Sequence, residues 1–231
     1  MHRAGERLIL ITVLASATAC EDSGTADLQT FTDSASYALG LNIATSIKRE
    51  GADLAIPQLL AGISDALEDR TPAVTEAQLR ELLPRLVQQA TEARDARRIG
   101  AAEENQRMGQ TFLAENGGRA GVTTTASGLQ YEVTRESDGP RPTATDEVRV
   151  HYRGTLINGT EFDATDPNGD GVTFAVGEVI AGWTEGLQLM SVGSAYRFYI
   201  PSQLAYGEPG YPPDIGPNQT LIFEVELLAI E

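Results

Sequence analysis

The chain has very little of the chemistry that most hydrolases and metalloproteins need. Its 231 residues include one cysteine, Cys20, and two histidines, His2 and His151. A single cysteine cannot form a disulfide within the chain, and these three residues cannot supply the four ligands of a zinc site. Because His2 lies in a predicted leader, a Cys–His nucleophile pair in the mature chain is excluded as well. We expect no metal and no cofactor.

Basic residues and long apolar runs are also scarce. Lys and Arg number 17 against 33 Asp and Glu, which gives a formal charge of −16. An acidic surface repels phosphate, so nucleic acid is not an expected partner. No apolar run reaches the roughly 18 residues of a membrane-spanning helix. The apolar fraction of 41% nevertheless excludes a wholly disordered chain.

Residues 1–20 have the layout of a secretory signal peptide. A basic start precedes an apolar stretch at 8–15 and a small-residue region that ends at Cys20. This ending resembles a bacterial lipobox, whose cysteine is lipidated and becomes the new N-terminus, although Ala17 stands where leucine is usual. The alternative is a plain signal peptide with an incidental cysteine. Residues 21–32 are small and polar, which is typical of a flexible tether.

Residues 33–116 show helical patterns. Asp33 is a candidate cap for a first helix, and Pro57 favours the first turn of a second. Thr75 and Gln78 form a capping-box signature for a long segment that reaches about Asn116. Pro84 lies inside this segment and is expected to kink or break it.

The second part of the long segment, residues 91–107, is mostly Ala, Arg, Glu and Gln, with Ile99 its only large apolar residue. It predicts a solvated connecting rod rather than a core helix. The helices before it are too few to make a good core alone. Pairing two copies would bury their leucines, so we expect a homodimer through residues 33–90. The alternative is a small monomeric bundle packed on the C-terminal domain.

Residues 117–231 are rich in strand patterns, and residues 148–163 predict a β-hairpin. Apolar and polar residues alternate up to Tyr152, and Asn158-Gly159 favours a two-residue type I′ turn. Phe162 and Asp163 follow on the second strand. A tyrosine, a phenylalanine and a carboxylate from neighbouring strands could therefore share one pocket.

The rest of this half contains several further strands, a long loop at 204–218 and a single helical pattern at 179–190. That helix carries the only tryptophan, Trp183. The pattern indicates an α+β chain in which an all-helical N-terminal domain and connecting helix precede an antiparallel sheet wrapped round one short helix.

Six blocks in this half stand in a specific order: VHYRGTL, FD, VIAGW, EGLQLM, IPSQLAYG and LIFEVELL. In order and spacing they resemble FK506-binding (FKBP) type peptidyl-prolyl cis–trans isomerases. SGLQYEV and the helical half are similar to the macrophage-infectivity-potentiator and FkpA branch, and the resemblance covers about residues 28–231. It implies a dimerisation domain with its connecting helix at 33–116 and an isomerase domain at 117–231.

The resemblance also implies an aromatic cup that takes a proline ring. Trp183 would form its floor, and Ile215 would close it. The backbone N–H of Ile180 and the hydroxyl of Tyr206 would bind peptide carbonyls, with Asp163 on the polar rim. The implied lining residues are Tyr152, Phe162, Val179, Ile180 and Phe223. Asp163 could alternatively serve only to brace the hairpin.

By this resemblance the chain assists folding of secreted and envelope proteins, acts on proline-containing unfolded polypeptides and takes FK506-like macrolides as ligands. It also implies chaperone activity and a periplasmic location, with a lipid on Cys20 as the outer-membrane tether. The alternative is a binding module with the same fold and negligible turnover. Rotation about an amide needs no nucleophile, so no catalytic triad is expected. His151, on the opposite strand face from Tyr152, is expected to be non-catalytic.

Two residues depart from the family pattern, and one loop resembles part of a calcium site. Val172 replaces the usual aromatic residue of one pocket wall, and Gly216 replaces the first proline of an Ile-Pro-Pro sequence. Both substitutions bear on substrate preference. Residues 166–171 resemble the start of a calcium loop, but Gly177 stands where the twelfth-position glutamate is needed. We interpret them as a turn-rich loop.

Overall fold

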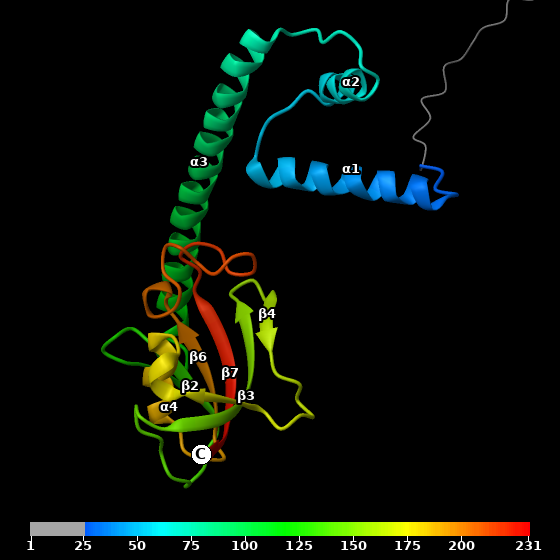
Figure 1. Cartoon of the computed structure of the whole chain (residues 1–231). Helices are drawn as coiled ribbons and strands as arrows, with labels where there is room; N and C mark the ends of the chain where they lie inside the picture. Colours follow the sequence, from blue (N-terminus) through cyan, green and yellow to red (C-terminus); the bar gives the residue numbers. More distant parts are fainter. Residues whose placement is uncertain (1–25) are drawn as a thin grey trace, which may run out of the picture. The chain divides into compact units, whose positions relative to one another are not determined.

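The computed structural model describes residues 26–231. The predicted signal peptide, Cys20 and the beginning of the predicted tether lie outside the described residues. Figure 1 shows the helices and strands in sequence colours. No helix within residues 26–231 combines the length and the apolar character needed to cross a membrane.

The first helix, α1 (Phe31–Glu50), begins two residues before the predicted cap. The Thr30 backbone N–H donates to Asp33 Oδ2 at 2.8 Å, and the Asp33 N–H donates to Thr30 Oγ1 at 3.1 Å. Thr30 is therefore the cap, and Asp33 is its partner in the first turn. This reciprocal pair satisfies two backbone donors that would otherwise lack an acceptor.

The other N-terminal helices are α2 (Ile56–Leu67) and α3 (Glu76–Asn116). Pro57 lies in the first turn of α2, and Thr75 and Gln78 form the predicted capping box of α3. The predicted break at Pro84 is wrong, since α3 runs through it as one long helix (Figure 1). Proline removes one backbone donor, and this part of α3 is exposed, so water can satisfy the carbonyl left without a partner.

Apolar side chains of the N-terminal helices are largely uncovered within one chain. No residue of α1 or α2 is buried. The first part of α3 is similar, with Leu83 56% and Val87 65% exposed. Residues 91–107 are exposed except for Ala102, which is buried, and Asn105, which is half-buried, so most of the predicted rod is solvated. Gly109, just beyond the rod, is also buried, and these small residues let another segment approach closely.

Seven strands form one antiparallel sheet, and α4 (Ala181–Leu189) lies against one of its faces (Figure 1). The strand order is β1-β2-β6-β7-β3-β4, and β5 pairs with β3. This arrangement confirms the predicted α+β fold. The bounds are β1 (Val122–Thr124), β2 (Gln130–Arg135), β3 (Glu147–Leu156), β4 (Glu161–Ala164), β5 (Val172–Ala175), β6 (Ala195–Ile200) and β7 (Leu221–Ile230).

The core lies between α4 and the inner face of the sheet. Leu187 of α4 is fully buried, as is Phe198 of β6. Gly186 allows their close packing, since a Cβ there would lie 2.7 Å from the Phe198 ring. Alternate residues of β7 fill the same core, as the period-2 pattern predicts. The seating of α4 fixes Trp183, which stands in its first turn.

Candidate functional site

The β3–β4 hairpin forms as predicted, but its turn differs. Residues 157–160 connect the two strands, and Gly159 has a φ of 86° whereas Asn158 does not have a positive φ. A type I′ turn requires positive φ at both central residues, so that prediction is wrong. The Asn158 side chain instead accepts a hydrogen bond from the Thr160 N–H at 3.0 Å, which closes the longer turn.

An irregularity in this hairpin brings two consecutive residues to the same pocket. Gly154 pairs with Asp163 and Thr155 pairs with Glu161, which leaves Phe162 as an extra residue. Successive residues of a regular strand face opposite sides, and a bulge of this kind redirects side chains. Gly154 makes room for the result, because a Cβ there would lie 2.7 Å from the Phe162 ring.

A cavity of about 330 Å³ lies between β3, β4, β5, β7, α4 and the loop 204–218. Its size is within the range of small-ligand pockets. Aromatic and aliphatic side chains dominate its lining, and it contains no His, Cys, Lys or Arg. The lining residues are Tyr152, Phe162, Asp163, Phe174, Glu178, Val179, Ile180, Trp183, Tyr206 and Phe223.

Trp183 is 4% exposed and is surrounded by three rings. Its centroid lies 5.3 Å from that of Tyr152, 5.6 Å from that of Phe174 and 5.2 Å from that of Phe223, all nearly perpendicular. Edge-to-face packing of this kind is favourable and holds a ring in place. Its Nε1 is the one buried side-chain nitrogen or oxygen in residues 26–231 without a hydrogen-bond partner. The indole thus forms a rigid apolar floor.

Two tyrosine hydroxyls and a carboxylate form the polar side of the cavity. The Tyr152 hydroxyl donates to Asp163 Oδ2 at 2.6 Å. Burial, and then this hydrogen bond, raise the pKa of Tyr152. Burial also raises the pKa of Tyr206, with smaller contributions from Tyr211 and Asp163. Both hydroxyls therefore remain protonated at neutral pH and keep their capacity to donate hydrogen bonds.

Ile180 is placed to offer a backbone donor. It is the N-cap of α4, and its carbonyl accepts the N–H groups of Trp183 and Thr184 at 2.9 and 3.0 Å. Its own N–H precedes the helix, and no acceptor for it is found within residues 26–231. The first N–H groups of a helix lack partners within the helix. An unpaired donor therefore stands beside the aromatic walls.

The structure gathers most of the predicted site residues in this cavity, but Ile215 does not line it. Ile215 is 2% exposed and belongs to the core, and its N–H and C=O pair with Tyr211. Sequence reasoning missed Phe174 and Glu178. Phe174 supplies a wall that was expected at residue 172, where Val172 is 42% exposed. The period-2 alternation of β5 puts residues 172 and 174 on one face, which could have indicated Phe174.

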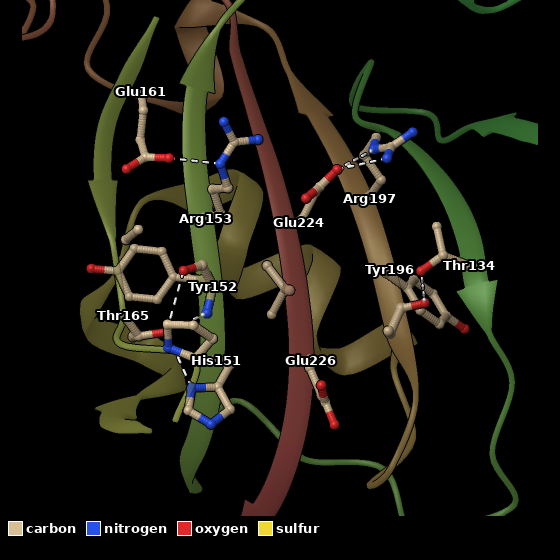
Figure 2. A pocket seen from close by; sticks show the side chains of 14 residues that line it. Thr134, His151, Tyr152, Arg153, Glu161, Thr165, Tyr196, Arg197, Glu224 and Glu226 are labelled. Carbon is tan, nitrogen blue, oxygen red and sulfur yellow. Dashed lines mark hydrogen bonds and ion pairs between the residues drawn. The ribbon is translucent and has the colours of Figure 1, made fainter. Parts of the chain in front are cut away.

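A larger cavity of about 630 Å³ lies on the outer face of the sheet (Figure 2). His151 lines this cavity and not the aromatic pocket, and its Nδ1 lies 3.2 Å from Thr165 Oγ1. Charged side chains here pair with one another, as in Arg153–Glu161 and Arg197–Glu224, both at 2.6 Å. Because the charged groups of this surface already pair with one another, few of them are left to bind a ligand. The smaller aromatic pocket is therefore the candidate site.

No group of three or more His, Asp and Glu side chains in the described residues is placed to hold a metal ion. The pocket chemistry consists instead of apolar walls, two neutral hydroxyls, an unpaired backbone N–H and two carboxylates. Such a set can enclose an apolar ring and bind neighbouring carbonyl groups. It offers no strong nucleophile.

Two known sequence families match the chain. Residues 139–228 match the family described as FKBP-type peptidyl-prolyl cis-trans isomerase. Residues 32–133 match the domain amino terminal to FKBP-type peptidyl-prolyl isomerase. The N-terminal match takes in β1 and ends within β2, and the isomerase match begins after β2.

Similar proteins extend over most of the chain. The FKBP-type 22 kDa peptidyl-prolyl cis-trans isomerase of Escherichia coli is 43% identical over 197 residues, covering 85% of this chain and 94% of that protein. The outer membrane protein MIP of Legionella longbeachae is 37% identical, with 94% of each chain covered. The crystal structure of FkpA from Escherichia coli has a TM-score of 0.71 at 33% identity, covering 89% of this chain and 99% of that one.

Proposed function

The chain belongs to the FKBP-type peptidyl-prolyl cis–trans isomerases, and from this membership we propose how its aromatic pocket acts. The substrates are unfolded or partly folded polypeptides that contain proline. The pocket rotates the bond before proline without any covalent intermediate. In this way the enzyme assists the folding of secreted and envelope proteins.

The chemistry of the reaction suits the residues present. Rotation of an X–Pro bond crosses a barrier of about 18–20 kcal/mol, because amide resonance is lost in the twisted state. Trp183 receives the proline ring, and the surrounding rings exclude water, which favours the polarised planar amide. The Ile180 N–H and the Tyr206 hydroxyl bind substrate carbonyls. These donors stabilise the twisted form more than the planar one.

Asp163 has a supporting part in this mechanism. It lines the pocket and accepts the hydrogen bond of the Tyr152 hydroxyl, so bracing and site roles coincide in one residue. A hydrogen bond to a charged group contributes about 1.5–3 kcal/mol. Asp163 thereby holds the Tyr152 ring in its place beside Trp183.

One observation carries the proposal: an apolar cavity with a rigid indole floor is edged by hydroxyl and N–H donors and offers no strong nucleophile. The test is a proline-isomerisation assay on a short peptide with the full-length protein. We expect Trp183→Leu and Asp163→Ala each to lower kcat/KM at least tenfold. His151→Ala, on the outer face of the same sheet, serves as the matched control and should leave kcat/KM unchanged.

Two results would contradict this proposal. One is a wild-type rate no faster than the uncatalysed reaction, which would favour a binding module with the same fold. The other is wild-type activity in both Trp183→Leu and Asp163→Ala, which would move the chemistry to another site. Inhibition by an FK506-like macrolide, lost in Trp183→Leu, would place ligand and substrate in the same pocket.

Chaperone activity is a second proposed function, supported by the apolar side chains that the N-terminal helices expose. Phe31 of α1 and Leu67 of α2, for example, are 87% and 80% exposed. We expect the protein to slow aggregation of an unfolded test protein. Trp183→Leu should retain this effect, because the helices and not the pocket would hold the client. Equal loss of both activities in that variant would contradict separate surfaces.

We further propose residues 33–116 as a dimerisation domain with its connecting helix and residues 117–231 as the isomerase domain. An envelope location is supported by the name of the Legionella longbeachae relative. A lipid on Cys20 would anchor the protein to the outer membrane from the periplasm. Mass spectrometry of the mature N-terminus tests this, since an unmodified Cys20 or its absence from the mature chain would exclude the anchor.

A further inference from the structure

The loop 204–218 connects the candidate site to α3. At one end it carries Tyr206, which lines the aromatic pocket. Near the other end, the Asn105 side chain of α3 donates from Nδ2 to the Pro217 carbonyl at 2.8 Å. The Asn218 side chain returns a longer bond, from Nδ2 to the Ala102 carbonyl at 3.4 Å. In Figure 1 this loop, drawn in orange, runs beside α3.

A short path of hydrogen bonds leads from this contact to Tyr206. The Asn218 backbone N–H donates to the Gly207 carbonyl at 2.9 Å. Gly207 directly follows Tyr206, and its own N–H donates to the Ser202 carbonyl at 2.9 Å. Asn218 has a φ of 52°, a conformation that asparagine tolerates better than most residues. A shift of residues 217–218 would therefore reach the backbone beside Tyr206.

α3 packs closely against the C-terminal end of this loop and the residues that follow it. Ala102 is 7% exposed, and Gly109 is buried against Thr220. A Cβ at Gly109 would overlap the Thr220 side chain. Small residues at these two positions let the helix backbone approach residues 218–220 closely. Asn105 stands on the same face, one turn beyond Ala102 and one turn before Gly109.

An ion pair between α3 and the loop is a weaker contact. Arg98 Nη1 lies 3.2 Å from Glu208 Oε1, and both side chains are about half exposed or more. Exposed ion pairs contribute little to stability or position. Asn105 is half-buried and donates to a backbone carbonyl, so its bond fixes the loop more firmly.

We propose that Asn105 is a positioning residue for the isomerase reaction, acting through the loop 204–218 on Tyr206. The inference rests on the proposed function, in which the Tyr206 hydroxyl binds a substrate carbonyl. Asn105 lies in a helix whose sequence matches the domain amino terminal to the isomerase. The helical half of the chain therefore helps to set the position of Tyr206 in the site.

A double-mutant cycle in the full-length protein tests this inference. The variants are Asn105→Ala, Tyr206→Phe and the two combined, with kcat and KM measured on a proline-containing peptide. Alanine favours helix, so Asn105→Ala should keep α3 folded. Gln106→Ala is the matched control, since Gln106 also bears an amide on α3 but is exposed. It should leave both constants unchanged.

We expect Asn105→Ala to lower kcat/KM about fivefold and to divide the loss between kcat and KM as Tyr206→Phe does. In the Tyr206→Phe background the Asn105→Ala change should have no further effect, because the hydroxyl it positions is gone. Asn105→Asp keeps the shape but turns an acceptor oxygen toward the Pro217 carbonyl, so it should lower kcat/KM at least as much as Asn105→Ala. The melting temperature of each Asn105 variant, compared with that of the wild type, shows whether the fold is retained.

Three outcomes would overturn the inference. In the first, Asn105→Ala lowers kcat/KM by the same factor in both backgrounds, so it acts independently of Tyr206. In the second, Tyr206→Phe lowers kcat/KM but Asn105→Ala does not. In the third, Tyr206→Phe itself has no effect, which removes the role of Tyr206 from the proposed function and the basis of the inference with it.

Discussion

A single glycine, Gly154, sets how closely two aromatic walls of the pocket can pack. Gly154 has no side chain, yet the Phe162 and Phe223 rings both lie over it. A Cβ there would stand 2.7 Å from Phe162 and 2.9 Å from Phe223, closer than real atoms pack. Gly154 therefore sets how deeply two walls of the pocket can close.

Gly154→Ala should lower kcat/KM at least tenfold, because the added methyl group displaces Phe162 and Phe223. The strain should also lower the free energy of unfolding by about 1–3 kcal/mol, the usual effect of overpacking. Peptide isomerisation and urea unfolding measure the two effects. Gly100→Ala is the control, since a Cβ there meets no atom within 4 Å. Normal activity in Gly154→Ala would show that the rings can move without harm.

Tyr152 makes the free energy of unfolding depend on pH. Its pKa is raised by burial and by Asp163, above the value of about 10 in the unfolded chain. The stability contributed by the neutral hydroxyl is therefore complete below about pH 10 and is lost as pH rises through the folded pKa. The free energy of unfolding should fall more steeply above pH 10 in the wild type than in Tyr152→Phe. Urea unfolding between pH 8 and 11 measures this, and equal slopes would contradict it.

Among the elements, α3 has two successive parts of different character. Its first part exposes large apolar side chains, whereas its second part buries the small residues Ala102 and Gly109. Hydrophobicity alone does not distinguish a small buried residue from a small exposed one. Whether such a residue is buried depends on its packing partner, which here is the end of the loop 204–218 together with Thr220.

Two glycines of α3 should respond oppositely to the same substitution. Gly100→Ala should raise the free energy of unfolding by up to about 1 kcal/mol, because alanine favours helix and the site is open. Gly109→Ala should lower it by roughly 1–3 kcal/mol, because the new methyl group overlaps buried Thr220. Urea denaturation of both variants checks this. A gain in stability from Gly109→Ala would mean that the helix–loop contact is loose.

For the whole molecule, the uncovered apolar surface supports the proposed homodimer. Leu60 of α2 and Leu83 of α3 are 60% and 56% exposed in one chain. Many other large apolar side chains of α1, α2 and the first part of α3 are exposed as well, and extensive apolar surface in water usually marks an interaction site. The formal charge of −16 keeps separate molecules apart, so a specific apolar contact is needed for association.

Light scattering on the mature protein should therefore give twice the mass of one chain. Leu60→Glu combined with Leu83→Glu should reduce it to the mass of a monomer, because charges would have to be buried in the contact. Gln58→Glu, which adds a charge at an exposed polar position of α2, is the control and should remain dimeric. A monomeric wild type would contradict the dimer and favour a bundle within one chain.

Much of this protein follows from its sequence alone. The alternation of apolar and polar residues up to Tyr152, the capping box at Thr75, the first-turn Pro57 and the ordered blocks around Trp183 predicted the fold and family correctly. Five of the six aromatic residues in the pocket lining were named from the sequence and the sixth, Phe174, was not; their part in substrate binding stays a prediction. These features are local: periodicity states which side of an element is apolar, and block order states which elements follow one another.

Which segments cover one another could not be predicted from local patterns and is visible only in the folded chain. The tertiary structure put Ile215 in the core, added Phe174 and Glu178 to the pocket, and turned Phe162 and Asp163 the same way through a bulge. It also seated Asn105 on the loop that carries Tyr206. Each depends on a contact between residues distant in sequence or on one extra residue in a strand. A local pattern contains neither kind of information, because it records the character of a surface and not its partner.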